Sequence, residues 1–241
     1  MAGASAERQE TGVVESINKQ VKKTGPINVK AGATMLKNVV KASKFTGRQA
    51  GGSEPYTDVV IETSDKKTYN LSLKGEAAPS LAGGGLKGLE LAVPGIAKKF
   101  MTTAYNHLVK KLKLKTGDKV PDVYGKIGDG DKVKIVVGNK AMGGPIDFMY
   151  IGPMDVRAVY DDKRNLLTLN GALTDAKTYA KTHDLYFRLR ARREDQRFDT
   201  NAKDNYNVPK IYGKSPSKGD SAGRIVVTDK TPSQAEIVRL V

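Results

Sequence analysis

The stretch from residue 55 to residue 76, "PYTDVVIETSDKKTYNLSLKGE", alternates apolar and polar positions in two short runs around the polar turn "SDKK". Such alternation on either side of a turn predicts a β-hairpin, because successive side chains of a strand point to opposite faces. The apolar positions that define the two strands are Val59 and Ile61 in the first and Tyr69, Leu71 and Leu73 in the second.

An acidic residue opens this hairpin and a lysine closes it. A turn centred between Asp65 and Lys66 pairs residues whose numbers sum to about 131. That register sets Asp58 opposite Leu73 and beside Lys74. The carboxylate and the ammonium are therefore expected to meet at the open end of the hairpin.

Residues before the hairpin have a different pattern. Residues 1–30 are polar, and any helix over residues 13–23 ends at Gly25 and Pro26, so this segment is interpreted as an N-terminal arm. In "AGATMLKNVVKASKF" the spacing of the apolar positions predicts an amphipathic helix. These positions are Met35, Leu36, Val39, Val40 and Phe45.

The middle of the chain mixes helix and strand signals. "LELAVPGIAKKFMTTAYNHLVKKLKL" has helical periodicity that is interrupted at Pro94 and Gly95, which predicts a short helix, a break and a longer helix. "DKVKIVVGN" is interpreted as a buried strand. In the second half, "IDFMYIGPMDVRAVYDDKRNLLTLNG" predicts at least two strands around the turn "DDKRN".

The last third of the chain continues this mixture. "LTDAKTYAKTH" predicts a short helix capped by Thr174 or Asp175, and "DLYFRLRARRED" and "RIVVTD" predict further strands. The pattern indicates an α/β protein. After the arm we expect a single domain over residues 31–241, with a core over about residues 31–140 and a β-rich extension over about residues 141–241.

Charge adds a prediction about partners. With 41 Lys and Arg against 26 Asp and Glu, the net charge of +15 favours a polyanion such as DNA, although a solvated basic surface is the alternative. The absence of cysteine excludes disulfides, thiolate zinc sites and cysteine nucleophiles. Two histidines exclude a multi-histidine metal site within one chain. No apolar run reaches the length of a membrane span or a signal peptide, so we expect no membrane contact and a cytoplasmic location.

The hairpin residues suit phosphodiester hydrolysis. That reaction needs a cation at the phosphate, an activated water and positive charge near the transition state. Oxygen ligands suit Mg²⁺, and Asp58 and Lys74 supply one carboxylate and one ammonium. The alternative is a surface ion pair between the two, which is worth ~0–1 kcal/mol.

"PYTDVVI" followed by "LSLKG" resembles the PD-(D/E)XK restriction-endonuclease-like superfamily, in which an acid at a strand start faces a D/E-X-K motif on the paired strand. Residues 55–58 match the first half and Lys74 matches the lysine. The resemblance implies a restriction-endonuclease-like mixed sheet flanked by helices. It also implies a catalytic site that binds Mg²⁺ as its cofactor, with Mn²⁺ as a substitute. Ser72 departs from the pattern, because it stands where the motif has an acid.

Some restriction enzymes of this superfamily have the same Ser-X-Lys variant and take the missing carboxylate from the following helix. Glu90, separated from Lys74 by residues 75–89, is the expected migrated ligand. Ser72 would then be a supporting group. The competing ligand is Glu76. Further acids, each a weaker candidate, are Glu10, Glu15 and Asp147.

An arginine-rich strand provides candidate phosphate contacts. In "YFRLRARRED", Arg188, Arg190 and Arg192 share one side and Arg193 follows, a spacing that suits consecutive phosphates. The alternative is a solvated face paired with nearby acids.

These observations together predict a Mg²⁺-dependent DNA endonuclease. "PYTDVV", "LSLKGE" and "GRIVVTDK" also resemble proteins encoded in tailed-phage genomes. The alternative function is therefore a non-catalytic nucleic-acid-binding or virion structural protein with a degenerate nuclease-like fold. The partners would be DNA and either a second copy of the chain or a virion assembly.

Overall fold

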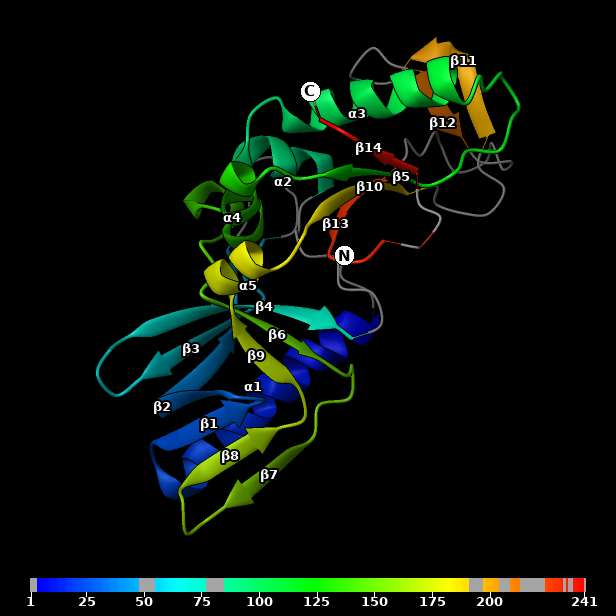
Figure 1. Ribbon diagram of the computed structural model, residues 1–241. Coiled ribbons are helices and arrows are strands. Elements are labelled where there is room, and N and C mark those ends of the chain that lie inside the picture. The colour runs from blue at the N-terminus through cyan, green and yellow to red at the C-terminus, as the bar shows by residue number, and fades with distance from the viewer. Residues whose placement is uncertain are drawn as a thin grey trace.

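The computed structural model describes residues 4–47, 55–76, 85–190, 197–203, 209–212, 224–231, 233 and 236–240. These residues form a mixed α/β fold with one sheet of eight strands and a second sheet, flanked by five helices. The expected α/β class with a mixed sheet flanked by helices is confirmed. Figure 1 shows the large sheet with α1 against one face in the lower half, and the second sheet with α3 in the upper half.

The large sheet has the order β7-β8-β1-β2-β3-β4-β6-β9. Its strands are β1 (Ile27–Ala31), β2 (Thr34–Lys44), β3 (Val59–Thr63), β4 (Thr68–Gly75), β6 (Phe148–Gly152), β7 (Ala158–Asp161), β8 (Leu166–Leu169) and β9 (Ala172–Asp175). Neighbours are antiparallel, except that β1 runs parallel to β8 and β4 runs parallel to β6. The sheet therefore draws on both halves of the chain, and the expected division at residue 140 does not follow its boundaries.

The second sheet has the order β13-β10-β5-β14, and a separate ribbon pairs two further strands. These strands are β5 (Val123–Lys126), β10 (Tyr186–Arg190), β13 (Arg224–Thr228), β14 (Glu236–Val238), β11 (Arg197–Lys203) and β12 (Pro209–Tyr212). The helices are α1 (Ala4–Thr24), α2 (Gly85–Ala92), α3 (Ile96–Asn106), α4 (Asp129–Val137) and α5 (Ala176–Thr182). A π-helical turn (His107–Lys111) extends α3, and a 3₁₀ turn (Lys140–Met142) follows α4.

Two hydrophobic cores lie on opposite faces of the β4–β6 pair. One core joins α1 to the large sheet and includes Leu71, Leu73 and Tyr150. The other joins α2, α3, α4 and α5 to the second sheet and includes Met149 of β6. Because strand side chains alternate between faces, these two strands form a wall shared by both cores.

The predicted N-terminal arm is instead helix α1, which belongs to the first core. Val13 and Ile17 are both 0% exposed and pack on the large sheet. Residues 9, 13 and 17 are spaced by four positions, so they lie on one helical stripe. The many polar residues of this segment form the other face of a half-buried helix.

The predicted helix over residues 31–45 is wrong, because most of the segment forms strand β2. Its buried positions Leu36, Val39 and Ala42 are three residues apart, a spacing typical of a helix. The spacing arises from register shifts in β2, where Asn38 adopts a positive φ of 53°. A β-bulge inserts one residue into a strand, so it converts a two-residue repeat into a three-residue step.

The predicted strand "DKVKIVVGN" is helix α4. Ile135, Val136 and Val137 are consecutive buried residues, a pattern that both a buried strand and a buried helix can satisfy. Asp129 and Asp131 lie in the first turn, where negative charge complements the helix dipole.

Several other elements are confirmed. Helix α2 ends at Ala92 and α3 begins at Ile96, so the break lies at Pro94 and Gly95 as expected. Asp175 caps α5, because its Oδ1 accepts the Thr178 N–H at 2.7 Å. Strands β7 and β8, β10 and β13 match the strands predicted in the second half, although β14 follows β13.

The packing of α3 on the second sheet predicts the effect of two glycine substitutions. A Cβ on Gly125 would lie 2.7 Å from Phe100, which is fully buried and 5.3 Å from Phe187 between ring centroids. Gly125→Ala is expected to lower the free energy of unfolding by about 1–3 kcal/mol, because the packed ring has no room to move. Urea denaturation measures this change.

Gly130→Ala is the matched control. A Cβ on Gly130, in α4, meets nothing within 4 Å. Alanine favours helix more than glycine by about 0.8–1 kcal/mol, so this variant should be as stable as the wild type or more stable. Equal losses in both variants would contradict the packing of Phe100 on Gly125.

Candidate functional site

The β3–β4 hairpin positions the candidate acid. Val59 pairs with Leu71 and Val60 with Asn70, so the register differs by one residue from the expected one. Continued by one residue past β3, this register sets Asp58 opposite Ser72 rather than Leu73, and the Asp58 N–H donates to the Leu71 carbonyl at 2.8 Å. A shift of one residue reverses the face of every side chain in a strand. Here it sets the acid on the same face as the Ser-X-Lys side chains.

The Asp58 carboxylate is anchored to β4. Its Oδ2 accepts the Ser72 hydroxyl at 3.2 Å and the Leu73 N–H at 2.6 Å. Ser72 is only 2% exposed, so its hydroxyl needs a partner within the protein. This serine therefore holds the acid in place, consistent with the supporting role expected for it.

Lys74 follows on the same face of β4 as Ser72, since residues two positions apart in a strand share a face. Leu71 and Leu73 point the other way, into the core under α1. The backbone at this position is also held, because Gln9 Nε2 donates to the Lys74 carbonyl at 3.2 Å. The structure thus places Asp58 against Ser72, and alternation along β4 puts the Lys74 side chain on the same face.

Gln9 is a positioning residue that the sequence analysis missed. It is 2% exposed, and its Nε2 also donates to the Gly152 carbonyl of β6 at 2.9 Å. One amide therefore ties α1 to the ends of both β4 and β6. The available signal was its place on the stripe of Val13 and Ile17, where a polar residue implies a buried hydrogen bond.

Glu90, the expected migrated ligand, caps helix α3. Its Oε2 accepts the Gly95 N–H at 2.6 Å, and its Oε1 accepts the N–H groups of Ala97 at 2.8 Å and Lys98 at 3.2 Å. The first N–H groups of a helix lack internal partners, and a carboxylate there also complements the helix dipole. The geometry gives Glu90 a structural role, and its metal-ligand role stays a prediction.

The other candidate acids have separate places. Glu76 is exposed beyond the end of β4. Burial, and to a lesser extent the negative charge of Glu76, raises the pKa of Tyr150 to about 12. Asp147 joins β4 to β6, since its Oδ2 accepts the Asn70 N–H at 2.8 Å. Glu10 Oε2 lies 3.9 Å from Lys44 Nζ, and Glu15 is exposed on α1.

No group of three or more His, Asp or Glu side chains arranged to hold a metal ion occurs in the part of the chain that the structure describes. Among the acids of the described hairpin, Asp58 is the one whose carboxylate contacts Ser72 and the Leu73 N–H.

Arg188, the first of the predicted phosphate contacts, has partners within the second sheet. Its Nε donates to Asp122 Oδ2 at 3.0 Å, and its guanidinium carbon lies 5.8 Å from the centroid of the Tyr124 ring. Tyr124 stands opposite Arg188 in the β5–β10 ladder. The side chain of Arg190 and all of Arg192 and Arg193 lie outside the described residues, so the phosphate-contact role of this strand stays a prediction.

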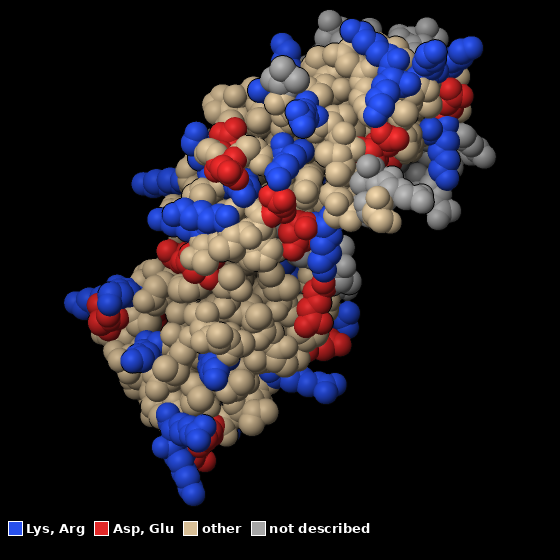
Figure 2. Space-filling model, in the orientation of Figure 1, with Lys and Arg blue, Asp and Glu red and all other residues tan. Residues whose placement is uncertain are grey.

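A basic surface also follows α3 and its π-helical extension. We call it the α3 lysine ridge, and its exposed members are Lys98, Lys99, Lys110, Lys111, Lys113 and Lys115. Residues 96–117 contain no Asp or Glu. In Figure 2, basic side chains gather over the upper half of the molecule, whereas the visible face of the large sheet is mostly uncharged. The run "KKLKLK" within the α3 lysine ridge is typical of the solvated end of a helix, where cations complement the helix dipole.

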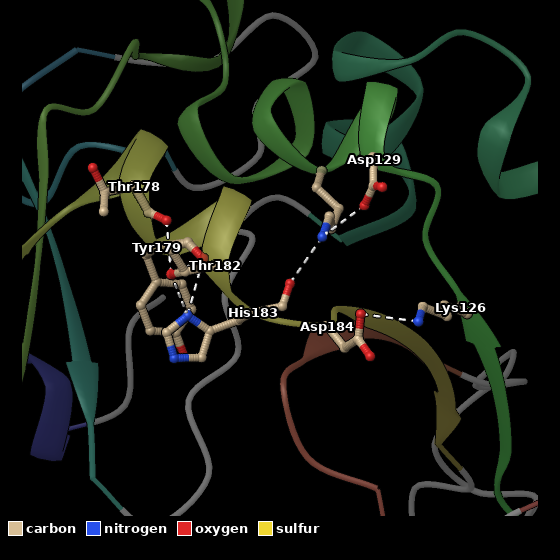
Figure 3. A network of polar contacts seen from close by, with 8 residues as sticks. Lys126, Asp129, Thr178, Tyr179, Thr182, His183 and Asp184 are labelled. Carbon is tan, nitrogen blue, oxygen red and sulfur yellow. Dashed lines mark hydrogen bonds and ion pairs between the residues drawn. The ribbon is translucent and has the colours of Figure 1, made fainter.

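A polar network links α4 to the end of α5 (Figure 3). Lys132 is 6% exposed along its side chain, and its Nζ lies 2.8 Å from Asp129 Oδ1 and 3.0 Å from the His183 carbonyl. The His183 ring stacks on Tyr179 with centroids 3.9 Å apart. Burial raises the pKa of Tyr179, and its hydrogen bond to Asp229 raises it further. The buried ammonium is thus satisfied by one carboxylate and one carbonyl, and the network holds α5 against α4.

No protein-family model, curated protein or solved structure matches this chain. The resemblance to the PD-(D/E)XK superfamily therefore depends on the residues of the hairpin and stays a prediction. None of the described helices is long and apolar enough to cross a membrane.

The capping role of Glu90 predicts a stability effect. Glu90→Ala removes the acceptor for three N–H groups and should lower the free energy of unfolding by about 1–2 kcal/mol, as measured by urea denaturation. Glu90→Gln keeps one acceptor oxygen, so its loss should be smaller. Glu15→Ala, at an exposed position of α1, is the control that should change little. An unchanged stability of Glu90→Ala would contradict the cap.

Proposed function

We propose that the protein is a Mg²⁺-dependent endonuclease that hydrolyses phosphodiester bonds of DNA. The observation that supports this proposal most strongly is the arrangement of the β3–β4 hairpin. Asp58 is fixed by Ser72 and by the Leu73 N–H, on the face of β4 that also carries Lys74. An acid and a lysine on adjacent strands match two of the three groups of the superfamily motif, and Ser72 stands in place of the third.

The donor set suits a hard cation that keeps much of its own water. Mg²⁺ is commonly held by one or two carboxylates together with waters and substrate phosphates, so Asp58 would be the protein ligand in the described part of the site. Bound there, Mg²⁺ or Mn²⁺ would polarise the phosphate and lower the pKa of a water. Lys74 would place its ammonium beside the phosphate and stabilise negative charge as it develops.

The basic surface supports a polyanionic substrate. The chain carries a net charge of +15, and the α3 lysine ridge concentrates cations within residues 96–117, which contain no acidic residue. Lysine and arginine residues that neutralise phosphates release counterions, and this release drives DNA binding at low salt. The ridge would therefore hold DNA in a way that depends little on its sequence.

Cleavage assays test the endonuclease directly. Wild-type protein is expected to cut supercoiled, linear or single-stranded DNA in Mg²⁺ or Mn²⁺ and to stop when the metal is chelated. Lys74→Ala and Asp58→Asn should each lower the cleavage rate by at least about 100-fold, because each removes charge at the reacting phosphate. Gel analysis of the products under single-turnover conditions measures these rates.

Lys67→Ala is the matched control for this assay. Lys67 lies in the turn of the same hairpin, where its Nζ contacts Asp65 at 2.8 Å. The control should cut at the wild-type rate. Glu90→Gln separates the two roles of Glu90: lost cleavage by a variant that is still folded indicates a metal ligand, and retained cleavage indicates a cap alone. Absence of metal-dependent cleavage by the wild type on all three substrates would contradict the proposal.

A second candidate function is non-catalytic binding of nucleic acid, in a cell or in a virion. The observation that favours it is the use of Glu90 as a helix cap, together with a serine at position 72. On this hypothesis the hairpin is architectural and the α3 lysine ridge is the functional surface.

The lysine ridge predicts a local salt dependence of DNA binding. The double variant Lys98→Gln/Lys99→Gln should weaken binding equally for different DNA sequences. It should also reduce the slope of log K against log salt by up to about 1.8, or about 0.9 for each lost phosphate contact. The control pair Lys22→Gln/Lys23→Gln, in the last turn of α1, should change the slope much less. Fluorescence anisotropy over a salt series measures both slopes, and equal changes in the two pairs would contradict a local interface.

A further inference from the structure

Strand β7 forms one edge of the large sheet. It is the terminal strand in the order of eight, and within the described residues it pairs with β8 alone. Figure 1 shows β7 at the outer margin of the large sheet, with no labelled helix or strand beyond it. Val159, in the middle of β7, is 72% exposed, more than any other large apolar side chain in the described part of the chain.

The hydrogen bonds to β8 show which backbone groups of β7 face outward. Asn170 N donates to the Arg157 carbonyl at 3.1 Å, and Arg157 N donates to the Asn170 side chain at 2.9 Å. Bonded positions recur at every second residue of an antiparallel ladder, so Val159 and Asp161 also face β8. The N–H and C=O groups of Ala158 and Tyr160 therefore face away from the sheet.

We propose that the protein forms a symmetric dimer in which β7 pairs antiparallel with β7 of a second copy, through the two Val159 residues. In this register the outward groups of Ala158 lie opposite those of Tyr160 in the second copy, so the backbone bonds match. Val159 and its copy form a close pair without backbone hydrogen bonds, the arrangement in which side chains contact best. The result is one sheet that continues through both copies.

Charge selects this register. Two residues on either side of Val159, Arg157 lies opposite Asp161 of the second copy, and Asp161 lies opposite Arg157 of the second copy. All three side chains share one face, since they are spaced by two. Asp161 Oδ2 also lies 3.6 Å from Arg164 Nε in the adjoining turn, but both side chains are exposed, so Asp161 stays at the surface.

The two neighbouring registers that satisfy the same backbone groups lose both charge pairs. A shift of one strand by two residues in one direction sets Val159 opposite Asp161 of the second copy, and the shift in the other direction sets Arg157 opposite Val159 of the second copy. The next charged residues, Lys163 and Asp155, lie in the turn after β7 and in the bend before it. The register through Val159 is therefore the one that pairs opposite charges along the edge.

Charge reversal tests this dimer through sedimentation velocity over a series of protein concentrations. Wild-type protein should pass from monomer to dimer as concentration rises. Arg157→Asp and Asp161→Arg should each remain monomeric, because each creates two like-charge pairs across the two-fold axis. An equimolar mixture of the two variants should form dimers again, since each chain then carries the charges that the other needs. The double variant on one chain should also dimerise.

Two further variants separate pairing from folding. Ala158→Pro removes an outward N–H and leaves the β8 ladder intact, so this variant should be folded and monomeric. Lys66→Asp makes the same change of charge in the β3–β4 turn and should dimerise like the wild type. A wild type that stays monomeric, a single charge variant that dimerises normally, or a mixture that fails to dimerise would each overturn the proposal. The dimer does not depend on nuclease activity.

Discussion

The parallel pairing of β4 with β6 is the constraint on which the rest of the structure depends. Its two faces belong to different hydrophobic cores, with Leu73 and Tyr150 on one side and Met149 on the other. A strand pair with both faces covered cannot shift its register by one residue, since every side chain would move into the wrong core. The position of Ser72 and Lys74 is fixed by the same requirement.

Buried polar groups of the β4–β6 pair need hydrogen-bond partners close by, and this need explains much of the candidate site. The hydroxyl of Ser72 donates to the Asp58 carboxylate, and the Gln9 amide donates to the carbonyls at the ends of β4 and β6. Tyr150 stays in place because its neighbours are glycines: a Cβ on Gly171 would lie 2.5 Å from its ring. The hairpin is therefore held from both cores. A group that binds a phosphate gains from such support, because little of its freedom is lost on binding.

The sequence predicted elements whose signals are local and missed those that tertiary structure decides. Strands β3 and β4 follow from the alternation of apolar and polar residues. The break between α2 and α3 follows from Pro94, which lacks a backbone N–H, and the cap of α5 follows from the side-chain oxygen of Asp175. Each of these signals lies in the local sequence. Strand β2 was misassigned because a bulge gave its apolar residues a three-residue spacing, and α4 because its buried run fits either element.

The candidate site was predicted to the same extent. The placement of Asp58 beside Ser72 followed from the hairpin, but the register differed by one residue because the turn is centred on Asp65, with Lys66 at a positive φ of 62°, and not between these two residues. The cap formed by Glu90 could not be predicted, since it depends on how the chain turns between α2 and α3.

The serine at position 72 has a consequence for how the site would use a metal. With an acid there, two carboxylates would face each other at a position where the serine is 2% exposed, and like charges in such a place need a cation to be stable. With serine, the Asp58 carboxylate is balanced by hydrogen bonds and the hairpin is complete without metal. Metal binding would then contribute little to folding and would depend on the ligands that a bound phosphate adds. On the endonuclease hypothesis, therefore, the substrate would help to assemble the metal site.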